Sequence, residues 1–216
     1  MKTASIEGVL FDMDGTIVDA FPPIIRALNQ TFIEFDLPTM SDVEVKRHTG
    51  KGDCSMISLF GDRKEEAGMR FLEIHDEDYL DHITPLDGAE SLFNWLKASN
   101  IPTAIVTSKS QVRAEAQLDV LGWSTYFETV IGKIPGRAEK PDPAPVLLAC
   151  ERLNIPPCAS IMIGDGIADM KAATRAGSRA LGMCDGFTAS ELEAVGALSC
   201  FDSLIEVQAW LQKQIR

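Results

Sequence analysis

The sequence is short of basic residues and has no long apolar stretch. It carries 20 lysines and arginines against 32 acidic residues, which gives a net charge of −12. A nucleic-acid-binding protein usually needs a basic face, so this balance speaks against a nucleic-acid partner. No run approaches the roughly 18 apolar residues of a membrane span, and the first residues lack the apolar core of a signal peptide. The sequence therefore predicts a cytoplasmic protein without a membrane partner.

Paired cysteines are also missing. The five cysteines are odd in number, scattered, and never form a C-x-x-C pair. Such usage is typical of reduced thiols rather than of a disulfide framework or a zinc site. A chain of 216 residues can bury a sizeable core without cross-links. Its length corresponds to about 1.4 ordinary domains, so one domain with an insertion or two small domains are expected. The composition is compatible with a monomer or a homodimer.

Short apolar runs alternate with amphipathic segments along most of the chain. Strands are expected at 6–11, 101–107, 129–132, 160–164 and 179–183. Helices are expected at 89–98, 110–121, 143–153 and 203–215, and a further helix follows the strand at 160–164 and runs to residue 176. Continuous apolar strands alternating with helices predict an α/β fold, with a Rossmann-like parallel sheet covered on both faces. Residues 20–83 break the pattern with helix-like spacing and no convincing strand. We therefore expect a core domain at 1–19 and 84–216 and an inserted helical cap domain at 20–83.

Polar residues of particular kinds follow or precede four of these elements. They are Asp12-Met13-Asp14-Gly15-Thr16, Thr107-Ser108-Lys109, Lys140 before a proline, and Gly164-Asp165-Gly166 with Asp169. Ligands of an open parallel sheet bind beyond the carboxyl ends of its strands, so these groups are expected to converge. Carboxylates without imidazole or thiol partners favour Mg²⁺ over zinc. A magnesium ion, a lysine and a hydroxyl together make a phosphoryl-binding site.

Asp12 and Asp14 lie two residues apart around a turn, where they can do different work. One carboxylate can attack phosphorus and form an acyl phosphate. The other can give a proton to the leaving alkoxide and later take one from water. Gly15 permits the sharp turn that follows.

The four motifs, in this order, resemble those of the haloacid dehalogenase superfamily. The likeness covers the whole chain and is nearest to the phosphoglycolate phosphatase and β-phosphoglucomutase-like branch, which carries a helical (C1-type) cap after the first strand. The resemblance implies that Asp12 is the nucleophile and that Asp14 is the general acid/base. It implies phosphoryl contacts from Thr107, the Ser108 amide and Lys140. It also implies magnesium ligation by Asp12, the Asp14 backbone carbonyl and Asp165, with Asp169 either ligating the ion or supporting its waters.

The stretch from Arg47 to Gly52 is small, basic and rich in glycine. Interpreted as a cap loop, it would let Arg47 and Lys51 meet a carboxylate or a second phosphate on the substrate. A plain turn between helices explains the glycines nearly as well, so both interpretations stay open.

Three other polar side chains are expected to have no part in the site. Lys109 is expected at the surface. His75 and His82 lie seven residues apart among acidic residues, which favours a solvated helix face over a metal pair.

The resulting expectation is a Mg²⁺-dependent phosphatase that hydrolyses a small phosphorylated metabolite through a phospho-Asp12 intermediate. A phosphomutase of the β-phosphoglucomutase type is the alternative, because it shares the cap and the nucleophile. A dehalogenase is disfavoured because it needs neither the second aspartate nor magnesium. A phospho-acceptor signalling module is disfavoured because it lacks a cap insertion and is shorter.

Overall fold

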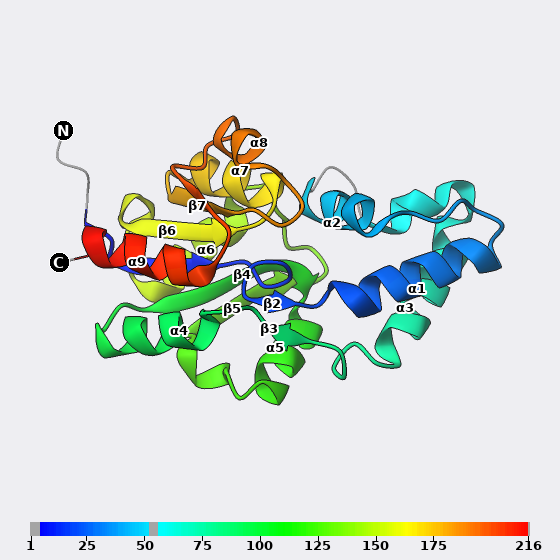
Figure 1. Cartoon of the computed structure of the whole chain (residues 1–216), viewed down its shortest axis with the longest axis horizontal. Helices are drawn as coiled ribbons and strands as arrows, with labels where there is room; N and C mark the ends of the chain where they lie inside the picture. Colours follow the sequence, from blue (N-terminus) through cyan, green and yellow to red (C-terminus); the bar gives the residue numbers. More distant parts are fainter. Residues whose placement is uncertain (1–4, 52–55, 216) are drawn as a thin grey trace.

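The computed structural model describes residues 5–51 and 56–215, without the side chains of residues 50 and 51. Its centre is a six-stranded parallel sheet with the strand order β5–β4–β1–β6–β7–β8 (Figure 1). The strands are β1 (Gly8–Phe11), β4 (Thr103–Ser110), β5 (Thr129–Lys133), β6 (Ser160–Gly164), β7 (Arg179–Met183) and β8 (Cys200–Phe201). The predicted α/β fold is confirmed.

Successive residues of each buried strand point to opposite sides of the sheet. Both faces therefore carry apolar side chains, and helices cover both of them. In β1, Val9 and Phe11 pack into one apolar cluster and Leu10 packs into the other. The first cluster includes residues of α4 (Ala89–Ala98), α5 (Gln111–Val120) and α9 (Leu204–Gln214). The second includes residues of α6 (Ala144–Leu153), α7 (Ile167–Ala176) and α8 (Ala189–Glu193).

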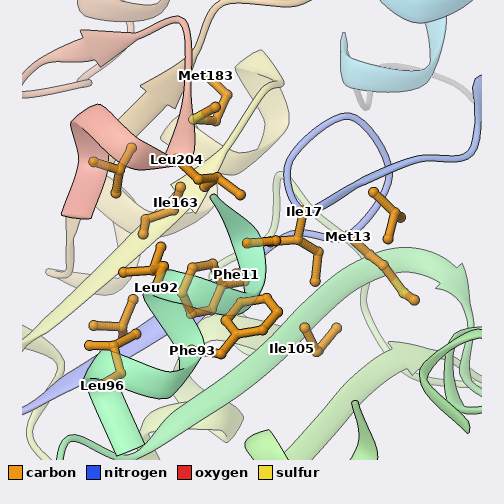
Figure 2. Close-up of a cluster of buried hydrophobic side chains, with 14 of the residues drawn as sticks. Phe11, Met13, Ile17, Leu92, Phe93, Leu96, Ile105, Ile163, Met183 and Leu204 are labelled. Atoms are coloured by element: carbon orange, nitrogen blue, oxygen red, sulfur yellow. The ribbon is translucent and has the colours of Figure 1, made fainter. Parts of the chain in front are cut away.

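The first cluster fixes the strand that leads into the site. Phe11 meets Phe93 of α4 edge to face, with ring centroids 5.5 Å apart (Figure 2). Each fully buried large apolar side chain contributes about 1.5–3 kcal/mol. Packing in this cluster therefore fixes the end of β1, directly before Asp12.

A helical insertion between β1 and β4 lies at one end of the long axis of the molecule (Figure 1). It contains α1 (Phe21–Glu34), α2 (Asp42–Lys51), the 3-10 helix η1 (Met56–Arg63) and α3 (Lys64–Asp76). Its apolar side chains form a third cluster that includes Phe32, Phe60 and Phe71. Two short strands, β2 (Val18–Asp19) and β3 (Thr84–Pro85), pair antiparallel where the chain leaves and re-enters the sheet domain.

The expectation of a loop at 47–52 is wrong for residues 47–51, which belong to α2. Gly52 lies outside the described residues, as does Cys54, while the four described cysteines are free thiols. The sequence pattern also does not reveal the two-residue strands β2, β3 and β8, or the short helices α8, η2 (Ser124–Tyr126) and η3 (Pro157–Ala159). Among the described helices, none is long and apolar enough to cross a membrane.

Candidate active site

The turn after β1 places the two aspartates at the edge of the sheet. Gly15 adopts a φ of 77°, and its N–H donates to the Val18 carbonyl at 2.8 Å. A Cβ atom at this position would lie only 2.7 Å from Oδ2 of Asp165. The turn that carries Asp12 and Asp14 therefore packs directly against the end of β6, which is possible only with glycine at this position.

Gly15→Ala is expected to destabilise the fold by about 2 kcal/mol, because a side chain is strained at positive φ and also strikes Asp165. Catalytic activity should fall with it, since Asp165 must move. Gly122→Ala is the matched control, because Gly122 has a φ of 70° but open space around its Cβ position. Thermal unfolding and enzyme assays of both variants test this; equal activity of the two would contradict the packing argument.

Three carboxylates gather at this edge of the sheet. Asp12, Asp165 and Asp169 each offer an oxygen, and these oxygens all lie within 4.8 Å of one another. Asp165 is 3% exposed and accepts a hydrogen bond from Thr16 Oγ1 at 3.1 Å. Asp169, at the first turn of α7, is 1% exposed and accepts from the Gly166 N–H at 3.0 Å.

Lys140 is the buried cation of this cluster. Its Nζ atom lies 2.9 Å from Oδ1 of Asp12 and 2.6 Å from Oδ1 of Asp169, and it donates to the Val106 carbonyl at 2.9 Å. Burial alone would lower the pKa of Lys140, but the charges of Asp12 and Asp169 outweigh it and raise the pKa above its ordinary value. Lys140 is therefore a permanent positive charge in the site.

One lysine does not neutralise three carboxylates. Burial, and then the charge of Asp12, raise the pKa of Asp169 to about 7. Burial and the charges of Asp12 and Asp169 raise the pKa of Asp165 well above its usual range. Carboxyl groups with such raised pKa values are stabilised in their ionised form by an additional cation. The donor set, carboxylate oxygens only, fits a hard divalent cation.

Thr107 and Ser108 of β4 lie on the same cavity as the aspartates. Thr107 is buried, and its Oγ1 accepts from the Lys109 N–H at 3.2 Å, while Ser108 is exposed. The register of β4 against β5 shifts between Val106 and Ser110, so the strand does not simply end at this point. The structure thus brings Thr107, Ser108 and Lys140 to the sheet edge that carries Asp12.

The expectation of a surface position for Lys109 is wrong. Its side chain is 6% exposed, and Nζ forms an ion pair with Oδ1 of Asp14 at 2.8 Å. His82 is exposed as predicted, although it lies beyond the end of α3 rather than on a helix face, and the prediction is wrong for His75, which is buried. His75 packs between the rings of Phe71 and Tyr79. Burial, and then the charge of Lys109, lower the pKa of His75, so its imidazole is neutral near pH 7.

A cavity of about 800 Å³ lies between the sheet edge and the insertion. Asp12, Asp14, Thr107 and Lys140 line its core side. The insertion contributes apolar and polar side chains, which include Ile24, His48, Thr49, Phe71 and His75. A pocket of this volume can enclose a small organic molecule together with its phosphate.

Arg47 lies elsewhere. Its guanidinium forms an ion pair with Glu191 at 2.5 Å, donates to the Gly186 carbonyl at 3.2 Å and lies over the Phe187 ring. It is not among the residues that line the cavity, although its neighbours His48 and Thr49 are. Arg47 therefore joins the insertion to the sheet domain. The side chain of Lys51 lies outside the described residues.

The comparisons with known proteins agree with this geometry. The sequence pattern of the haloacid dehalogenase-like hydrolases matches residues 9–183, which include all four motifs. The chain belongs to the haloacid dehalogenase-like hydrolases. Its helical insertion between β1 and β4 is consistent with the C1-type cap of the phosphoglycolate phosphatase-like branch.

Relatives of this haloacid dehalogenase-like hydrolase carry the names of phosphatases. A phosphoglycolate phosphatase of Chromobacterium violaceum is 30% identical over 96% of this chain and 97% of that protein. An N-acetylmuramic acid 6-phosphate phosphatase of Pseudomonas putida is 29% identical over 81% of both chains. A solved structure described as a predicted phosphoglycolate phosphatase from Haemophilus somnus has a TM-score of 0.85 at 21% identity. It covers 95% of this chain and 97% of its own, and it shows the likeness of the fold.

Proposed function

We propose that this haloacid dehalogenase-like phosphatase is a Mg²⁺-dependent phosphomonoesterase that cleaves a small phosphorylated metabolite through a phosphoaspartyl intermediate on Asp12. One observation carries the proposal: the Asp12 carboxylate lies beside Lys140 and within 4.8 Å of the two buried carboxylates Asp165 and Asp169. This arrangement pairs a nucleophile with the charges that a phosphate ester needs for binding.

In the first step, a carboxylate oxygen of Asp12 bonds to phosphorus as the bond from phosphorus to the substrate oxygen breaks. The protonated Asp14 carboxyl gives its proton to the departing oxygen, so the product leaves as an alcohol. In the second step, the Asp14 carboxylate takes a proton from water while the water oxygen attacks phosphorus. The acyl phosphate bond breaks, inorganic phosphate leaves, and the Asp12 carboxylate is restored.

The other residues position the phosphoryl group. The Thr107 hydroxyl and the Ser108 N–H would bind its oxygens, and Lys140 would both bind the group and orient Asp12. Asp12, Asp165, Asp169 and the Asp14 carbonyl would hold Mg²⁺, which when bound neutralises carboxylates and phosphoryl oxygens.

We further propose the boundaries 20–83 for the cap domain and 1–19 with 84–216 for the core domain. The separate apolar cluster of the insertion and the β2–β3 pair at its joints support this division. The cap would close off water from the leaving-group side and help to select the substrate.

A screen of phosphorylated metabolites, scored for phosphate release with Mg²⁺ and with a chelator, tests the proposed function. We expect hydrolysis of at least one ester with Mg²⁺ and none with the chelator. The screen should include a two-carbon phosphorylated acid and a hexosamine 6-phosphate, because the named relatives act on leaving groups of such different size. If no ester releases phosphate, the proposal is contradicted. If a substrate is converted to its phosphate isomer without release of free phosphate, the enzyme is a mutase and not a hydrolase.

The metal-free protein is expected to lose stability as the pH rises from about 4 to about 7. Asp169 has a pKa of about 7 in the folded chain, and the pKa of Asp165 is also raised, whereas an aspartate in the unfolded chain has a pKa of about 3.9. The folded protein therefore binds more protons in this window, and its free energy of unfolding falls with increasing pH. Because Mg²⁺ favours the ionised carboxylates, it should raise the melting temperature more at pH 8 than at pH 5.

Thermal unfolding at both pH values, in chelator and in excess Mg²⁺, measures this difference. Asp169→Asn should weaken the pH dependence of the metal-free protein. Equal magnesium shifts at the two pH values would contradict the assignment of the raised pKa values to the metal ligands.

A further inference from the structure

Lys109 is a buried lysine that the proposed mechanism does not use. It comes from β4, and its Nζ atom lies 2.8 Å from Oδ1 of Asp14. That Asp14 oxygen is buried and has no hydrogen-bond partner among the described residues. The interaction that holds this oxygen is therefore its ion pair with Lys109.

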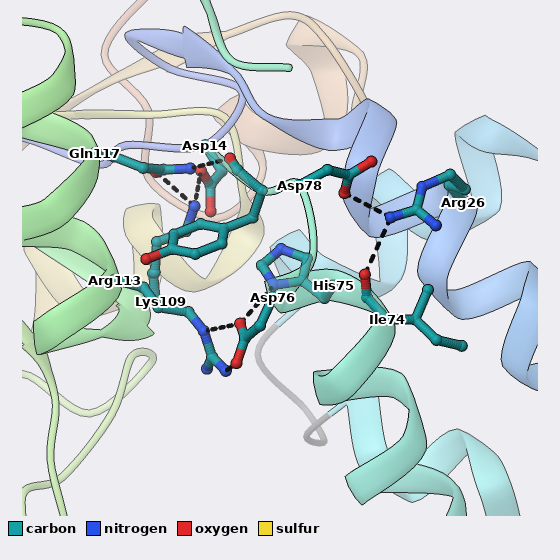
Figure 3. A network of polar contacts seen from close by, with 10 residues as sticks. Asp14, Arg26, Ile74, His75, Asp76, Asp78, Lys109, Arg113 and Gln117 are labelled. Atoms are coloured by element: carbon teal, nitrogen blue, oxygen red, sulfur yellow. Dashed lines mark hydrogen bonds and ion pairs between the residues drawn. The ribbon is translucent and has the colours of Figure 1, made fainter. Parts of the chain in front are cut away.

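Lys109 also contacts Gln117 (Figure 3). Its Nζ atom donates to Oε1 of Gln117 at 2.6 Å. Gln117 lies on α5 and is fully buried, and its Nε2 donates to the Tyr79 carbonyl at 3.4 Å. Tyr79 belongs to the segment that returns from α3 to β3. A continuous set of polar contacts thus runs from Asp14 through Lys109 and Gln117 to the returning end of the cap.

A second contact fixes this returning segment. Arg113 of α5, one turn before Gln117, pairs with both carboxylate oxygens of Asp76 at 2.7 and 2.6 Å (Figure 3). Asp78, two residues further, pairs with Arg26 of α1. The carbonyl that Gln117 contacts therefore belongs to a segment anchored on the core side and on the cap side.

We propose that Lys109 is a positioning residue for the Asp14 carboxyl group, and that Gln117 fixes Lys109 and links it to the returning end of the cap. The inference rests on the proposed function, because it concerns the group that delivers a proton to the leaving oxygen. A carboxyl group without a hydrogen bond on its buried oxygen can rotate about its side-chain bonds. The lysine charge, held between Asp14 and Gln117, selects one of these orientations.

The chemistry of the leaving group isolates this role. When 4-nitrobenzyl phosphate reacts with Asp12, the departing benzyl alkoxide needs the proton from Asp14. When 4-nitrophenyl phosphate reacts, the departing nitrophenolate is stable and leaves without a proton. The two esters differ by one methylene, and kcat/KM reports only the steps up to departure of the leaving group. Loss of Asp14 positioning should therefore lower kcat/KM for the benzyl ester alone.

Lys109→Met is expected to lower kcat/KM for 4-nitrobenzyl phosphate by about 100-fold, within the usual contribution of general acid catalysis, and to change it for 4-nitrophenyl phosphate by less than about threefold. Gln117→Leu should act in the same direction by about 10-fold, because Lys109 stays charged but loses its second contact. Lys109→Arg should recover most of the activity on the benzyl ester. Lys97→Met removes a lysine that contacts Tyr126 and does not line the cavity, so it should change neither rate.

An equal loss on both esters, or no loss on either, in Lys109→Met and Gln117→Leu would overturn the positioning role. If Lys109→Met does not fold, Gln117→Leu and Lys109→Arg carry the same comparison. Asp14→Asn distinguishes the role of Lys109 and Gln117 from the role of Asp14 itself. Selective loss in Asp14→Asn without selective loss in the Lys109 and Gln117 variants overturns this inference alone, whereas no selective loss in Asp14→Asn overturns the proposed role of Asp14.

Discussion

Asp12→Asn is expected to lower kcat by about 10⁴-fold or more, because an amide oxygen does not form the acyl phosphate. The fold should survive the substitution. Asp12 contributes to the raised pKa values of Asp165 and Asp169, so its neutralisation relieves repulsion between buried carboxylates while Lys140 keeps Asp169 as a partner. The melting temperature of the metal-free variant should therefore stay near that of the unaltered protein.

The control for this substitution is Asp36→Asn. Asp36 is an exposed residue of the cap with a φ of 54°, a conformation that asparagine adopts readily. Asp36→Asn makes the same chemical change at a residue that does not line the cavity, and its kcat should equal that of the unaltered protein. Steady-state assays and thermal unfolding of both variants measure the difference; an Asp12→Asn protein that is folded and fully active would contradict the account.

Lys140→Met is expected to lower kcat by about 10³-fold and to destabilise the metal-free protein by about 3–5 kcal/mol. Lys140 is 5% exposed and contacts two carboxylates and a carbonyl. Methionine fills a similar volume but leaves the buried Asp169 and the partly buried Asp12 without their cation. Excess Mg²⁺ should restore part of the lost stability, because it neutralises the same carboxylates, but little of the activity.

Denaturant unfolding with and without Mg²⁺, together with steady-state assays, measures both effects. Lys97→Met serves again as the control for loss of a lysine. A Lys140→Met protein as stable as the control in the absence of metal would show that the carboxylates do not depend on this charge.

The convergence of the site could be predicted because it depends on sheet topology. Parallel strands present their carboxyl ends at one edge, so acids that follow β1 and β6 must lie close together. The structure brings Asp12, Asp165 and Asp169 together as this rule requires. Lys140 follows no strand directly, but it precedes the helix at 143–153, and the same fold pattern placed it at this edge; the resemblance of the motifs added its role towards Asp12 and the phosphate.

Lys109 was not predicted, because the alternation of side chains along a strand no longer indicates their direction where the register of the strand shifts. Val106 and Ser110 of β4 lie on either side of such a shift, so the direction of the side chain between them does not follow from the sequence. His75 carried a signal that was usable. Phe71 and His75 lie four residues apart on α3, and Tyr79 follows at the same interval just beyond the end of the helix, so the spacing brings the three rings together.

The helix at 47–51 was obscured by its composition. Glycines and charges indicated a loop, but the helix begins several residues earlier with a readable signal. Ser41 and Glu44 form a capping box, in which Glu44 accepts from the Ser41 N–H at 2.8 Å and Ser41 Oγ accepts from the Glu44 N–H at 3.4 Å. The helix then places Arg47 towards the sheet domain and its neighbours towards the cavity.

The most direct test of the account is to find where the phosphoryl group resides during turnover. Enzyme mixed with a ³²P-labelled substrate and quenched in acid within one turnover should carry label that hydroxylamine removes, as expected for an acyl phosphate. Borohydride reduction followed by peptide mass analysis should then place the modification on Asp12. Rapid phosphate release with no protein-bound label, or label on any residue other than Asp12, would contradict the account.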